Sequence, residues 1–391
     1  MSPTSRLLVA SDVRVLRGPD GVAYATHPAG EYDAFAPLRG LRRRVTVISR
    51  DAASDRASRS GQRSSGAMTG PGVEHVGVPD YDSWGSLVRG LPSTAAVVWR
   101  SLGQHDAVWV RVPEPLSLVV GLLARLRGRP VIANVVADPA SLVVRGASRS
   151  ATRLLVLMSR MVLRRSSGVV YVTSQHLQRQ YPAPPGVATL VRSNVRLAGV
   201  RSEARSAPPA PRLRILTVGT NTGLSKGQDL VLELVRALAD RGLDVTADLV
   251  GGGDRTDWLE TRAAQLGIAD RCRIRGHVSD PDELRSAYDE ADVFCLPSRS
   301  EGLPRAVVEA LAVGLPAVGS AAGGIPELLD AAQVVATPTA DRLAAAVLAL
   351  VEEPGAYERA SRAALVTADR ICLSTRPEVL EQFLDRVLGQ T

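Results

Sequence analysis

Cysteine is scarce in this 391-residue chain, and its three cysteines form no paired pattern. Cys272, Cys295 and Cys372 are odd in number and far apart. Such spacing predicts neither a disulfide framework nor a zinc site, so we expect free, buried thiols. Aromatic residues are also scarce, at 4% of the chain. This scarcity counts against a protein that binds nucleic acid by stacking bases on aromatic rings.

Long apolar segments are missing as well. The longest uncharged segment, residues 310–326, contains four glycines and two prolines, a composition unsuited to a membrane-spanning helix. Residues 1–6 lack the apolar core of a secretory signal, so we expect a cytoplasmic protein. The apolar share of 45% and the charged share of 22% are typical of folded globular domains. They exclude a wholly disordered, collagen-like or coiled-coil chain.

Lysine is almost absent, because 46 of the 47 basic residues are arginine and Lys226 is the one exception. The charge is also unevenly divided. Residues 1–205 contain 28 arginines and 13 acidic residues, a surplus of +15, whereas residues 206–391 carry −8. This asymmetry predicts that the first half of the chain meets an anionic partner, such as a lipid surface, a phosphorylated substrate or nucleic acid.

Short β-branched and apolar segments alternate with helical stretches, which predicts doubly wound parallel α/β sheets. A proline-rich linker at residues 202–212 interrupts the alternation. We therefore predict two Rossmann-like domains, residues 1–201 and 213–375, that face a cleft, and a last helix at residues 376–391 that can return to the first domain. The predicted strands are residues 6–12, 45–50, 73–79, 107–112, 131–136, 168–174, 213–219, 245–250, 272–278, 291–297, 315–320 and 333–336.

Residues 51–72 separate two predicted strands and are rich in Ser, Gly and Arg. Almost no large apolar residue occurs among them, so we expect a loop. Two interpretations fit its length equally well. It is either a lid or substrate loop, or an insertion without a role in binding.

The most informative segment is residues 296–309, LPSRSEGLPRAVVE. A helix is expected to begin at Pro304 after a polar loop, and the backbone N–H groups at its start suit a phosphate. Glu301 lies in the loop and Glu309 in the helix, while Arg305 is the only cation at helical spacing from either. At least one carboxylate is thus available to sugar hydroxyls. The alternative is a capped helix with two solvated or Arg305-paired acids.

A second segment, residues 219–227 (GTNTGLSKG), follows the first strand of the second domain. Its glycines let the backbone approach a ligand closely, and Lys226 supplies a point charge for a phosphate. The segment is not a P-loop, because the second glycine and the Lys-Ser/Thr pair of that motif are absent. The alternative is a glycine-rich turn with a solvated lysine.

Two shorter segments have a structural and a functional interpretation. Residues 250–254 (VGGGD) predict either a ligand-facing turn or the entry to a helix. Asp280 and Asp282 fit a metal site or a helix N-terminus, and the surrounding sequence SDPDE favours the helix cap. We therefore predict no metal site and no cofactor other than the substrate itself.

Taken together, these segments resemble the retaining glycosyltransferases of family 4, which are group 1 glycosyl transferases with the GT-B fold. The resemblance is strong over residues 213–330 and weaker over the first 200, where it lies mostly in the strand layout. The residues that carry it are Lys226-Gly227, Gly251–Gly253, Gly276-His-Val278, Glu301, Gly302, Pro304, Glu309, Ala310, Gly314, Pro316 and Gly323-Gly-Ile-Pro-Glu327.

The resemblance implies a nucleotide-sugar donor in the second domain and an acceptor in the first. It assigns Glu301 and Lys226 to the reaction, with Lys226 on the donor diphosphate and Glu309 on the ribose hydroxyls. Further donor-binding positions that it implies are Gly302, Leu303 and Pro304 with Glu301 around the sugar, Gly219 and Thr220 near the diphosphate, and Val278 at the base.

The chain departs from the family at two places. Thr220 stands where the family often has an arginine, which leaves Lys226 to carry the diphosphate charge with help from the backbone. Residues 134–138 lack the histidine that the family often has there, and Asp138 is the candidate in its place on the acceptor side. The alternative for Asp138 is a strand-end turn. Gly21 is a second, weaker acceptor-side candidate.

No acidic residue occurs between Asp138 and Glu203. On a helix of 3.6 residues per turn, five arginines of this span share a sector of about 100°. They are Arg145, Arg149, Arg153, Arg160 and Arg164. The opposite side holds Leu154, Leu155, Met158, Met161 and Val162. We expect this basic helix to contact an anionic membrane surface. The alternative is an apolar side packed on the sheet and a solvated arginine side, and both can hold.

We therefore predict a metal-independent glycosyltransferase that moves a sugar from a UDP- or GDP-linked donor to a hydroxyl with retention. The acceptor is expected to be a lipid-linked glycan or a polysaccharide of the cell envelope, and the enzyme to associate with the inner face of the membrane. One alternative is a nucleotide-sugar epimerase on the same fold, which needs no acceptor. The other is a non-enzymatic binder of an anionic polymer, although the low aromatic content counts against nucleic acid.

Overall fold

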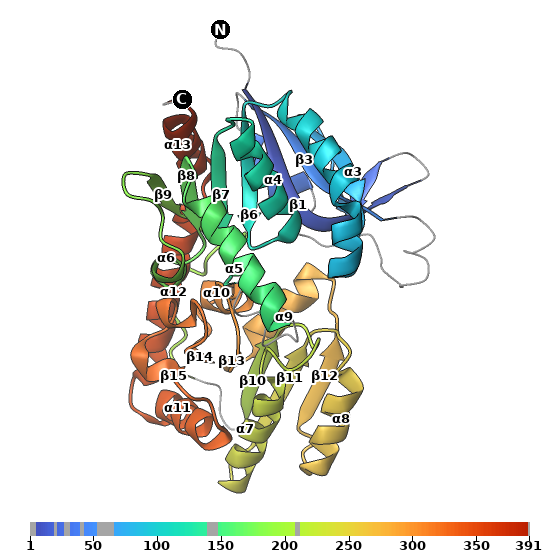
Figure 1. Cartoon of the computed structure of the whole chain (residues 1–391). Coiled ribbons are helices and arrows are strands. Elements are labelled where there is room, and N and C mark those ends of the chain that lie inside the picture. The colour runs from blue at the N-terminus through green and yellow to red at the C-terminus, as the bar shows by residue number, and fades with distance from the viewer. Residues whose placement is uncertain are drawn as a thin grey trace.

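The computed structural model describes residues 5–18, 22–26, 32–39, 43–52, 66–138, 148–207 and 212–389. Over these ranges the chain forms two α/β domains, one above the other in Figure 1, and each is built on its own sheet. Gly21, Arg145 and most of the loop predicted at residues 51–72 lie outside the described residues.

The first domain contains a sheet of nine described strands. Its parallel part runs β5-β3-β1-β6-β7-β8-β9. The end of β1 also pairs antiparallel with β2, and β2 pairs antiparallel with β4. The strands are β1 (Ser5–Arg17), β2 (Ala23–Ala25), β3 (Arg43–Asp51), β4 (Gly66–Ala67), β5 (Val73–Pro79), β6 (Ala107–Val112), β7 (Val131–Val135), β8 (Gly168–Tyr171) and β9 (Ala188–Val191).

Helices cover both faces of this sheet. Helices α3 (Trp84–Leu102), α4 (Pro115–Leu126) and α5 (Arg149–Leu163) pack around one core, and α1 (Tyr32–Arg39) packs on the other face. The short helix α6 (His176–Gln180) follows β8. Apolar β-branched side chains fill both cores, as expected for strands buried on two faces.

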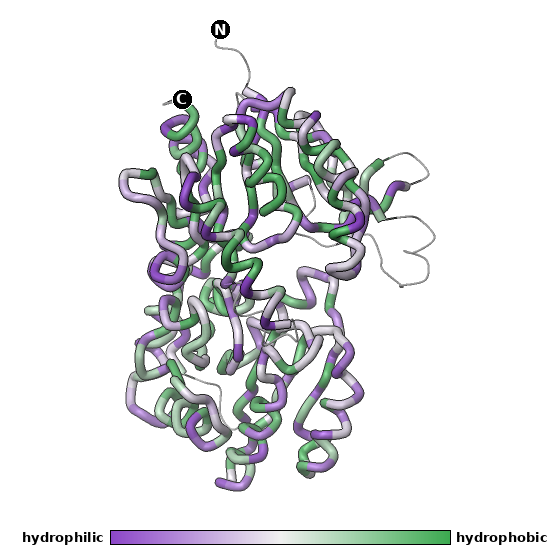
Figure 2. Tube along the Cα trace, in the orientation of Figure 1, coloured by the Kyte–Doolittle hydropathy of each residue, from purple (hydrophilic) through white to green (hydrophobic). Residues whose placement is uncertain are grey.

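The second domain has a six-stranded parallel sheet in the order β12-β11-β10-β13-β14-β15. Its strands are β10 (Leu213–Val218), β11 (Val245–Val250), β12 (Cys272–Gly276), β13 (Val293–Leu296), β14 (Ala317–Ser320) and β15 (Val334–Val335). Its helices are α7 (Gln228–Asp240), α8 (Thr256–Gln265), α9 (Pro281–Glu290), α10 (Arg305–Ala312), α11 (Ala340–Glu352) and α12 (Ala356–Ser374), with single 3-10 turns at η3 (Ile325–Glu327) and η4 (Ala331–Gln333). In Figure 2 the green, hydrophobic parts of the tube gather along the strands of both sheets.

The predicted α/β fold class with two parallel sheets is confirmed, and each of the twelve predicted strands overlaps an observed strand. Strands β2, β4 and β9 were not predicted, because two to four residues carry too little pattern to be recognised. The cysteines are all free, but only Cys295 is fully buried, whereas Cys272 and Cys372 are half-buried.

The segment between the domains packs closely on the second domain. The guanidinium of Arg205 donates hydrogen bonds to the carbonyl groups of Tyr288 (3.0 Å), Ala291 and Val313 (3.2 Å), and the Arg205 amide donates to the hydroxyl of Ser361. The chain then returns to the first domain in α13 (Pro377–Leu388), which packs beside α1 and β9. The first and last described elements, β1 and α13, consequently both pack in the first domain (Figure 1).

Helix α5 is amphipathic, but only part of its apolar side is buried. Leu155 and Val162 are buried in the core and Met158 packs against it. Leu154 and Met161 were expected on the same packed side, yet they are 46% and 40% exposed. They lie on the part of the helix surface that turns away from the sheet. None of the helices within the described ranges has the length and apolar character needed to cross a bilayer.

Candidate active site

The two loops predicted to bind the donor meet at the place where the strand order of the second sheet reverses. Strands β10 and β13 are neighbours, although 75 residues separate their loops in sequence. The loop after β10 holds Lys226, and the loop after β13 holds Glu301. Because the carboxyl ends of parallel strands lie at one edge, both side chains lie at this edge of the sheet, where ligands of open α/β sheets bind.

Lys226 and Glu301 form an ion pair at this edge. The Lys226 Nζ lies 2.7 Å from Oε1 of Glu301, and the hydroxyl of Ser298 donates to the same oxygen at 2.7 Å. The Glu301 side chain is 5% exposed and the Lys226 side chain 18% exposed. Both contacts use Oε1, so Oε2 is the oxygen placed to accept a hydrogen bond from a sugar hydroxyl. Neither Ser298 nor this ion pair was predicted from the sequence.

Arg299 links the loop after β13, which carries Glu301, to the loop after β10, which carries Lys226. Its guanidinium forms a two-pronged ion pair with Asp229 at the start of α7, with N–O distances of 2.9 and 2.6 Å. Its backbone N–H donates to the carbonyl of Ser225 at 2.8 Å. Arg299 therefore does not replace the arginine missing at position 220, because its charge is already engaged by Asp229.

The glycine-rich turn after β11 packs against the loop that carries Lys226. At Gly251 the φ angle is +149°, and a Cβ there would lie 1.8 Å from the carbonyl oxygen of Gly219. Only glycine allows this approach of two backbones. The Thr220 hydroxyl donates to the carbonyl of Gly252 at 3.1 Å, and Gly219 borders the Lys226 stem. The turn at residues 250–254 thus supports the lysine loop.

Glu309 projects from α10 and is held by Tyr288 of α9. The Tyr288 hydroxyl donates to Oε2 of Glu309 at 2.9 Å. Burial, and then the charge of Glu309, raise the pKa of Tyr288 well above 10, so the phenol stays a proton donor. Arg305 is exposed, and the described residues include no ion pair between it and either glutamate. Glu309 therefore receives a hydrogen bond and no salt bridge, with one oxygen fixed by the phenol.

The loop after Glu301 lies between the two domains. A Cβ on Gly302 would lie 2.3 Å from the carbonyl oxygen of Val136 in the first domain. Leu303 packs against the cores of both domains. Pro304 is the N-cap of α10, and no side chain caps this helix start. Its first N–H groups therefore have no acceptor from a capping side chain, and such groups can donate to an anion.

The other predicted positions are more widely spread. Val278 follows β12 and packs at the edge of the second core. Asp138 lies in the first domain at the end of β7, where its Oδ1 accepts a hydrogen bond from the hydroxyl of Tyr181 at 2.6 Å. Asp280 caps α9 by accepting from the amide of Asp282 at 3.0 Å, as predicted.

The first sheet also reverses its strand order, between β1 and β6, and charged residues missed by the sequence reasoning gather there. Asp12 Oδ1 accepts hydrogen bonds from the Tyr81 hydroxyl (2.7 Å) and the Leu116 amide (3.1 Å). Glu114 accepts from the Asp12 amide at 2.9 Å. Burial, and then the neighbouring charge of Glu114, raise the pKa of Asp12 to about 7. The two carboxyl groups are 102 residues apart in sequence, so no local motif signals them.

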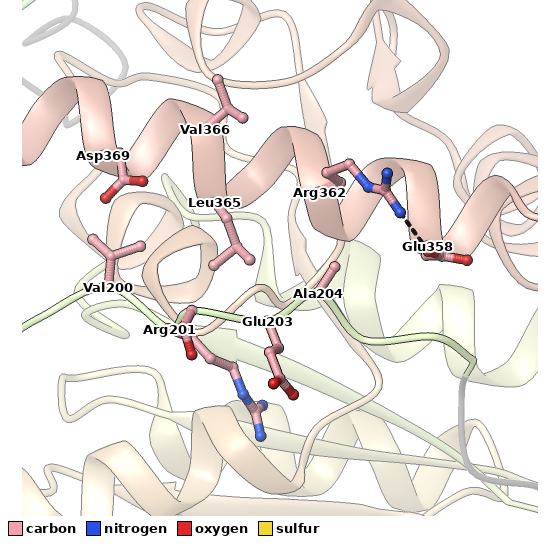
Figure 3. Close-up of a pocket in the computed structure, with 10 residues that line it drawn as sticks. Val200, Arg201, Glu203, Ala204, Glu358, Arg362, Leu365, Val366 and Asp369 are labelled. Carbon is pink, nitrogen blue, oxygen red and sulfur yellow. Dashed lines mark hydrogen bonds and ion pairs between the residues drawn. The ribbon is translucent and has the colours of Figure 1, made fainter.

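A surface groove of about 630 Å³ lies elsewhere, between the interdomain segment and α12 (Figure 3). Arg201 and Glu203 line it on one side, and Arg362, Leu365 and Asp369 on the other. None of the predicted donor residues lines it. We assign the candidate site to the Lys226–Glu301 crevice instead, because several independent loops bring chemically reactive groups together there.

Comparison with known proteins relates the second domain to a family. Residues 202–366 match the family described as glycosyl transferases group 1. The protein CapJ of Staphylococcus aureus is 24% identical over 267 residues, which are 65% of this chain and 65% of CapJ, slightly less than two thirds of its length. The GDP-mannose-dependent alpha-(1-6)-phosphatidylinositol monomannoside mannosyltransferase of Mycolicibacterium smegmatis is 26% identical over 292 residues, covering 69% of this chain and 74% of that enzyme.

A solved structure matches the whole chain. HepE of Anabaena, crystallised with UDP and glucose, superposes with a TM-score of 0.67 at 18% identity, covering 99% of this chain and 100% of HepE. The match to the glycosyl transferases group 1 therefore lies mainly in the second domain, and the two domains of the chain form a GT-B fold. The family and fold predicted from the motifs are confirmed, while membership of family 4 stays a prediction.

Proposed function

We propose that the protein transfers a sugar, with retention of anomeric configuration, from a UDP- or GDP-linked donor to a hydroxyl of a lipid-linked or polysaccharide acceptor. The observation that carries this proposal is the Lys226–Glu301 pair in the crevice at the carboxyl edge of the second sheet. A cation in contact with a carboxylate suits a ligand that has two unlike parts, an anionic diphosphate and a neutral, hydroxyl-rich sugar.

Lys226 and the start of α10 supply the charge stabilisation that the reaction needs. As the glycosidic bond breaks, negative charge grows on the leaving diphosphate. The ammonium of Lys226 has three N–H donors, one of which reaches Glu301, so it can bind a phosphate oxygen as well. The uncapped N–H groups of α10 add a favourable dipole. The departing phosphate is then placed to accept the acceptor proton on the same face of the sugar, which retains the configuration.

Glu301 and Glu309 each recognise a different part of the donor. Glu301 presents Oε2 to the sugar hydroxyls while Lys226 and Ser298 hold Oε1. Glu309, aligned by Tyr288, accepts hydrogen bonds from the ribose. The backbone near Val278 meets the base. The UDP and glucose bound to HepE support a nucleotide-sugar of this kind as the donor.

The acceptor is expected at the carboxyl edge of the first sheet, across the crevice from Glu301. Asp138 lies there, and Asp12 and Glu114 add a second pair of acidic groups that can bind hydroxyls. The phosphatidylinositol monomannoside in the name of the Mycolicibacterium relative supports a lipid-linked acceptor.

The outer face of the first domain supports association with a membrane. Exposed Leu154, Leu157 and Met161 of α5 lie beside the exposed arginines of the same helix, Arg149, Arg153, Arg160 and Arg164. The Arg125 guanidinium of α4 donates to the Met161 carbonyl at 2.9 Å, next to the 76% exposed Leu126. Apolar side chains flanked by arginines match an anionic bilayer, whose headgroups attract the charges while its acyl region takes the apolar groups.

The proposed function is tested by screening nucleoside-diphosphate sugars for transfer to lipid-linked and oligosaccharide acceptors. Product formation is followed by mass spectrometry, and the anomeric configuration is read by NMR. We expect turnover with a UDP- or GDP-sugar and a product of unchanged configuration. An inverted product contradicts the retaining mechanism, and isomerisation of the donor without an acceptor favours the epimerase.

A further inference from the structure

One carboxylate of the second domain reaches across to the first. Glu327, in the turn η3, accepts hydrogen bonds from the Ser174 hydroxyl (2.7 Å), the Gln175 amide (3.1 Å) and the His176 amide (2.6 Å). The Ser174 amide also donates to it. These donors are spread over both oxygens of the carboxylate, so a single side chain holds three consecutive residues of the other domain.

The amides that Glu327 binds belong to the start of α6. The N-cap residue of this helix, Gln175, makes no side-chain cap hydrogen bond. The first N–H groups of a helix have no partners within the helix and need an acceptor from outside. Glu327 provides that acceptor from the other domain. Hydrogen bonds to a charged group are also stronger than those between neutral groups.

The other side of the same turn contacts the donor loop. The Gly324 amide donates to the carbonyl of Gly302 at 2.7 Å. A Cβ on Gly323 would lie 2.2 Å from the carbonyl oxygen of Glu301. The turn at residues 323–327 thus packs on the backbone of Glu301 and Gly302 while its last side chain binds α6. A cavity of about 290 Å³ beside it is lined from both domains, by Ser174 and by Leu303 and Arg370 among others.

We propose that Glu327 is a positioning residue that sets the orientation of the first domain over the donor loop. This inference rests on the proposed function, in which the first domain presents an acceptor hydroxyl to the sugar held at Glu301. The series of contacts from α6 through Glu327 and the glycine turn to Glu301 sets the distance between the acceptor hydroxyl and the sugar. A misplacement of about 1 Å between reacting groups can cost about 100-fold in rate.

The experiment compares wild type with Glu327→Ala and Glu327→Gln, and with Glu352→Gln as a control on the exposed surface of α11. Hydrogen exchange of peptides covering residues 174–180 reports the contact itself. Calorimetry reports nucleoside-diphosphate affinity, and steady-state assays separate kcat from KM and transfer from donor hydrolysis. Because Gln keeps one acceptor oxygen but loses the charge, Glu327→Gln should fall between wild type and Glu327→Ala in each measurement.

For Glu327→Ala we expect exchange at residues 174–176 to become about tenfold faster, as the loss of a charged hydrogen bond implies. Nucleoside-diphosphate affinity should change by less than about twofold, whereas kcat for transfer should fall by about 100-fold, the cost of a misplaced reactant. Unchanged exchange, or an unchanged kcat with faster exchange, overturns the role of Glu327. A loss of nucleotide affinity equal to the loss of kcat overturns it too, because the residue would then act on the donor site alone. A wild type that transfers no sugar contradicts the proposed function instead.

Discussion

The two sheets reverse their strand order at equivalent places, but the charged groups found there interact in opposite ways. In the second domain the reversal brings together unlike charges, Lys226 and Glu301, at 2.7 Å. In the first domain it brings together like charges, Asp12 and Glu114, and the pKa of Asp12 rises to about 7 through burial and the charge of Glu114. The same topology thus builds an ion pair in one domain and a carboxyl group with a raised pKa in the other.

This difference teaches that the topology fixes where a site lies, whereas the side chains decide what it binds. Strands in the order 3-2-1-4-5-6 always place the loops after their first and fourth strands side by side. In the second sheet those loops hold Lys226 and Glu301. In the first sheet Glu114 lies in the loop after β6, whereas Asp12 lies within β1, where the pairing with β3 shifts register between Ala10 and Arg14. The donor and acceptor roles proposed for the two domains follow from these charges.

The largest effect is expected from removing the cation of the second site. Lys226→Met should lower transfer by about 10²–10³-fold, the usual loss when one group that stabilises transition-state charge is removed. It should also destabilise the fold by about 3–5 kcal/mol, because the buried Glu301 carboxylate loses its counter-charge. Transfer assays and denaturant unfolding measure the two effects.

The double variant Lys226→Met/Glu301→Gln separates these two causes. A neutral pair should recover most of the lost stability, since Gln still accepts from Ser298, but activity should stay low. Recovery of activity along with stability would show that Lys226 has only a structural role.

A smaller effect is expected at the ribose end of the same site. Glu309→Ala should weaken nucleoside-diphosphate binding by about 10–100-fold, the range for a hydrogen bond to a charged group. Tyr288→Phe should weaken it less, because the carboxylate remains and loses only its alignment. Calorimetry of both variants gives the order. If Tyr288→Phe proved the weaker binder, Glu309 would not be the direct contact.

The first site is tested through the pH dependence of stability. A carboxyl whose pKa is raised in the folded state contributes stability below its unfolded pKa of 3.8, and this contribution is lost as the pH rises through about 7. Asp12→Asn keeps the oxygen that accepts from Tyr81 and Leu116 but cannot ionise. We therefore expect wild type to lose stability relative to Asp12→Asn between pH 4 and pH 8, by at most about 4 kcal/mol at about 1.4 kcal/mol per pKa unit. Parallel denaturant curves over this range would refute the shift.

The smallest effect concerns the outer face of the first domain. Changing Arg149, Arg153, Arg160 and Arg164 to Gln should reduce binding to anionic vesicles by about tenfold or more, because each arginine near the surface contributes ~1 kcal/mol. The matched control changes four exposed arginines of the second domain to Gln, namely Arg236, Arg255, Arg342 and Arg359. Co-sedimentation should distinguish the two variants. Equal losses would mean that the protein binds lipid through its total charge rather than through α5.

Much of this arrangement could be predicted from the sequence. The strands and the two donor loops have local patterns, and the resemblance carried over residues 213–330 assigned Lys226, Glu301 and Glu309 together. The helix cap at Asp280 was predicted for the same reason, since its signals lie within five residues. Local motifs are therefore sufficient to identify the second domain's loops.

The contacts that the sequence did not predict join residues far apart in the chain. Glu327 and Ser174 are 153 residues apart, and Asp12 and Glu114 contact each other across 102. Glu327 belongs to the motif that carries the resemblance but had no role assigned to it, and the other three residues look like ordinary surface acids or turn residues on their own. The exposure of Leu154 and Met161 was missed for a related reason, because helical periodicity defines an apolar side but not how much of it a neighbouring helix covers.

The central claim is that the carboxyl edge of the second sheet binds the nucleoside diphosphate, and calorimetry of UDP and GDP tests it most directly. Wild type and Asp12→Asn should bind the preferred nucleotide with the same affinity. The double variant Lys226→Met/Glu301→Gln, folded as shown by its unfolding curve, should bind it about tenfold or more weakly, as expected for the loss of a charge-assisted contact. Equal affinity in all three proteins, or a loss in Asp12→Asn alone, would contradict the account.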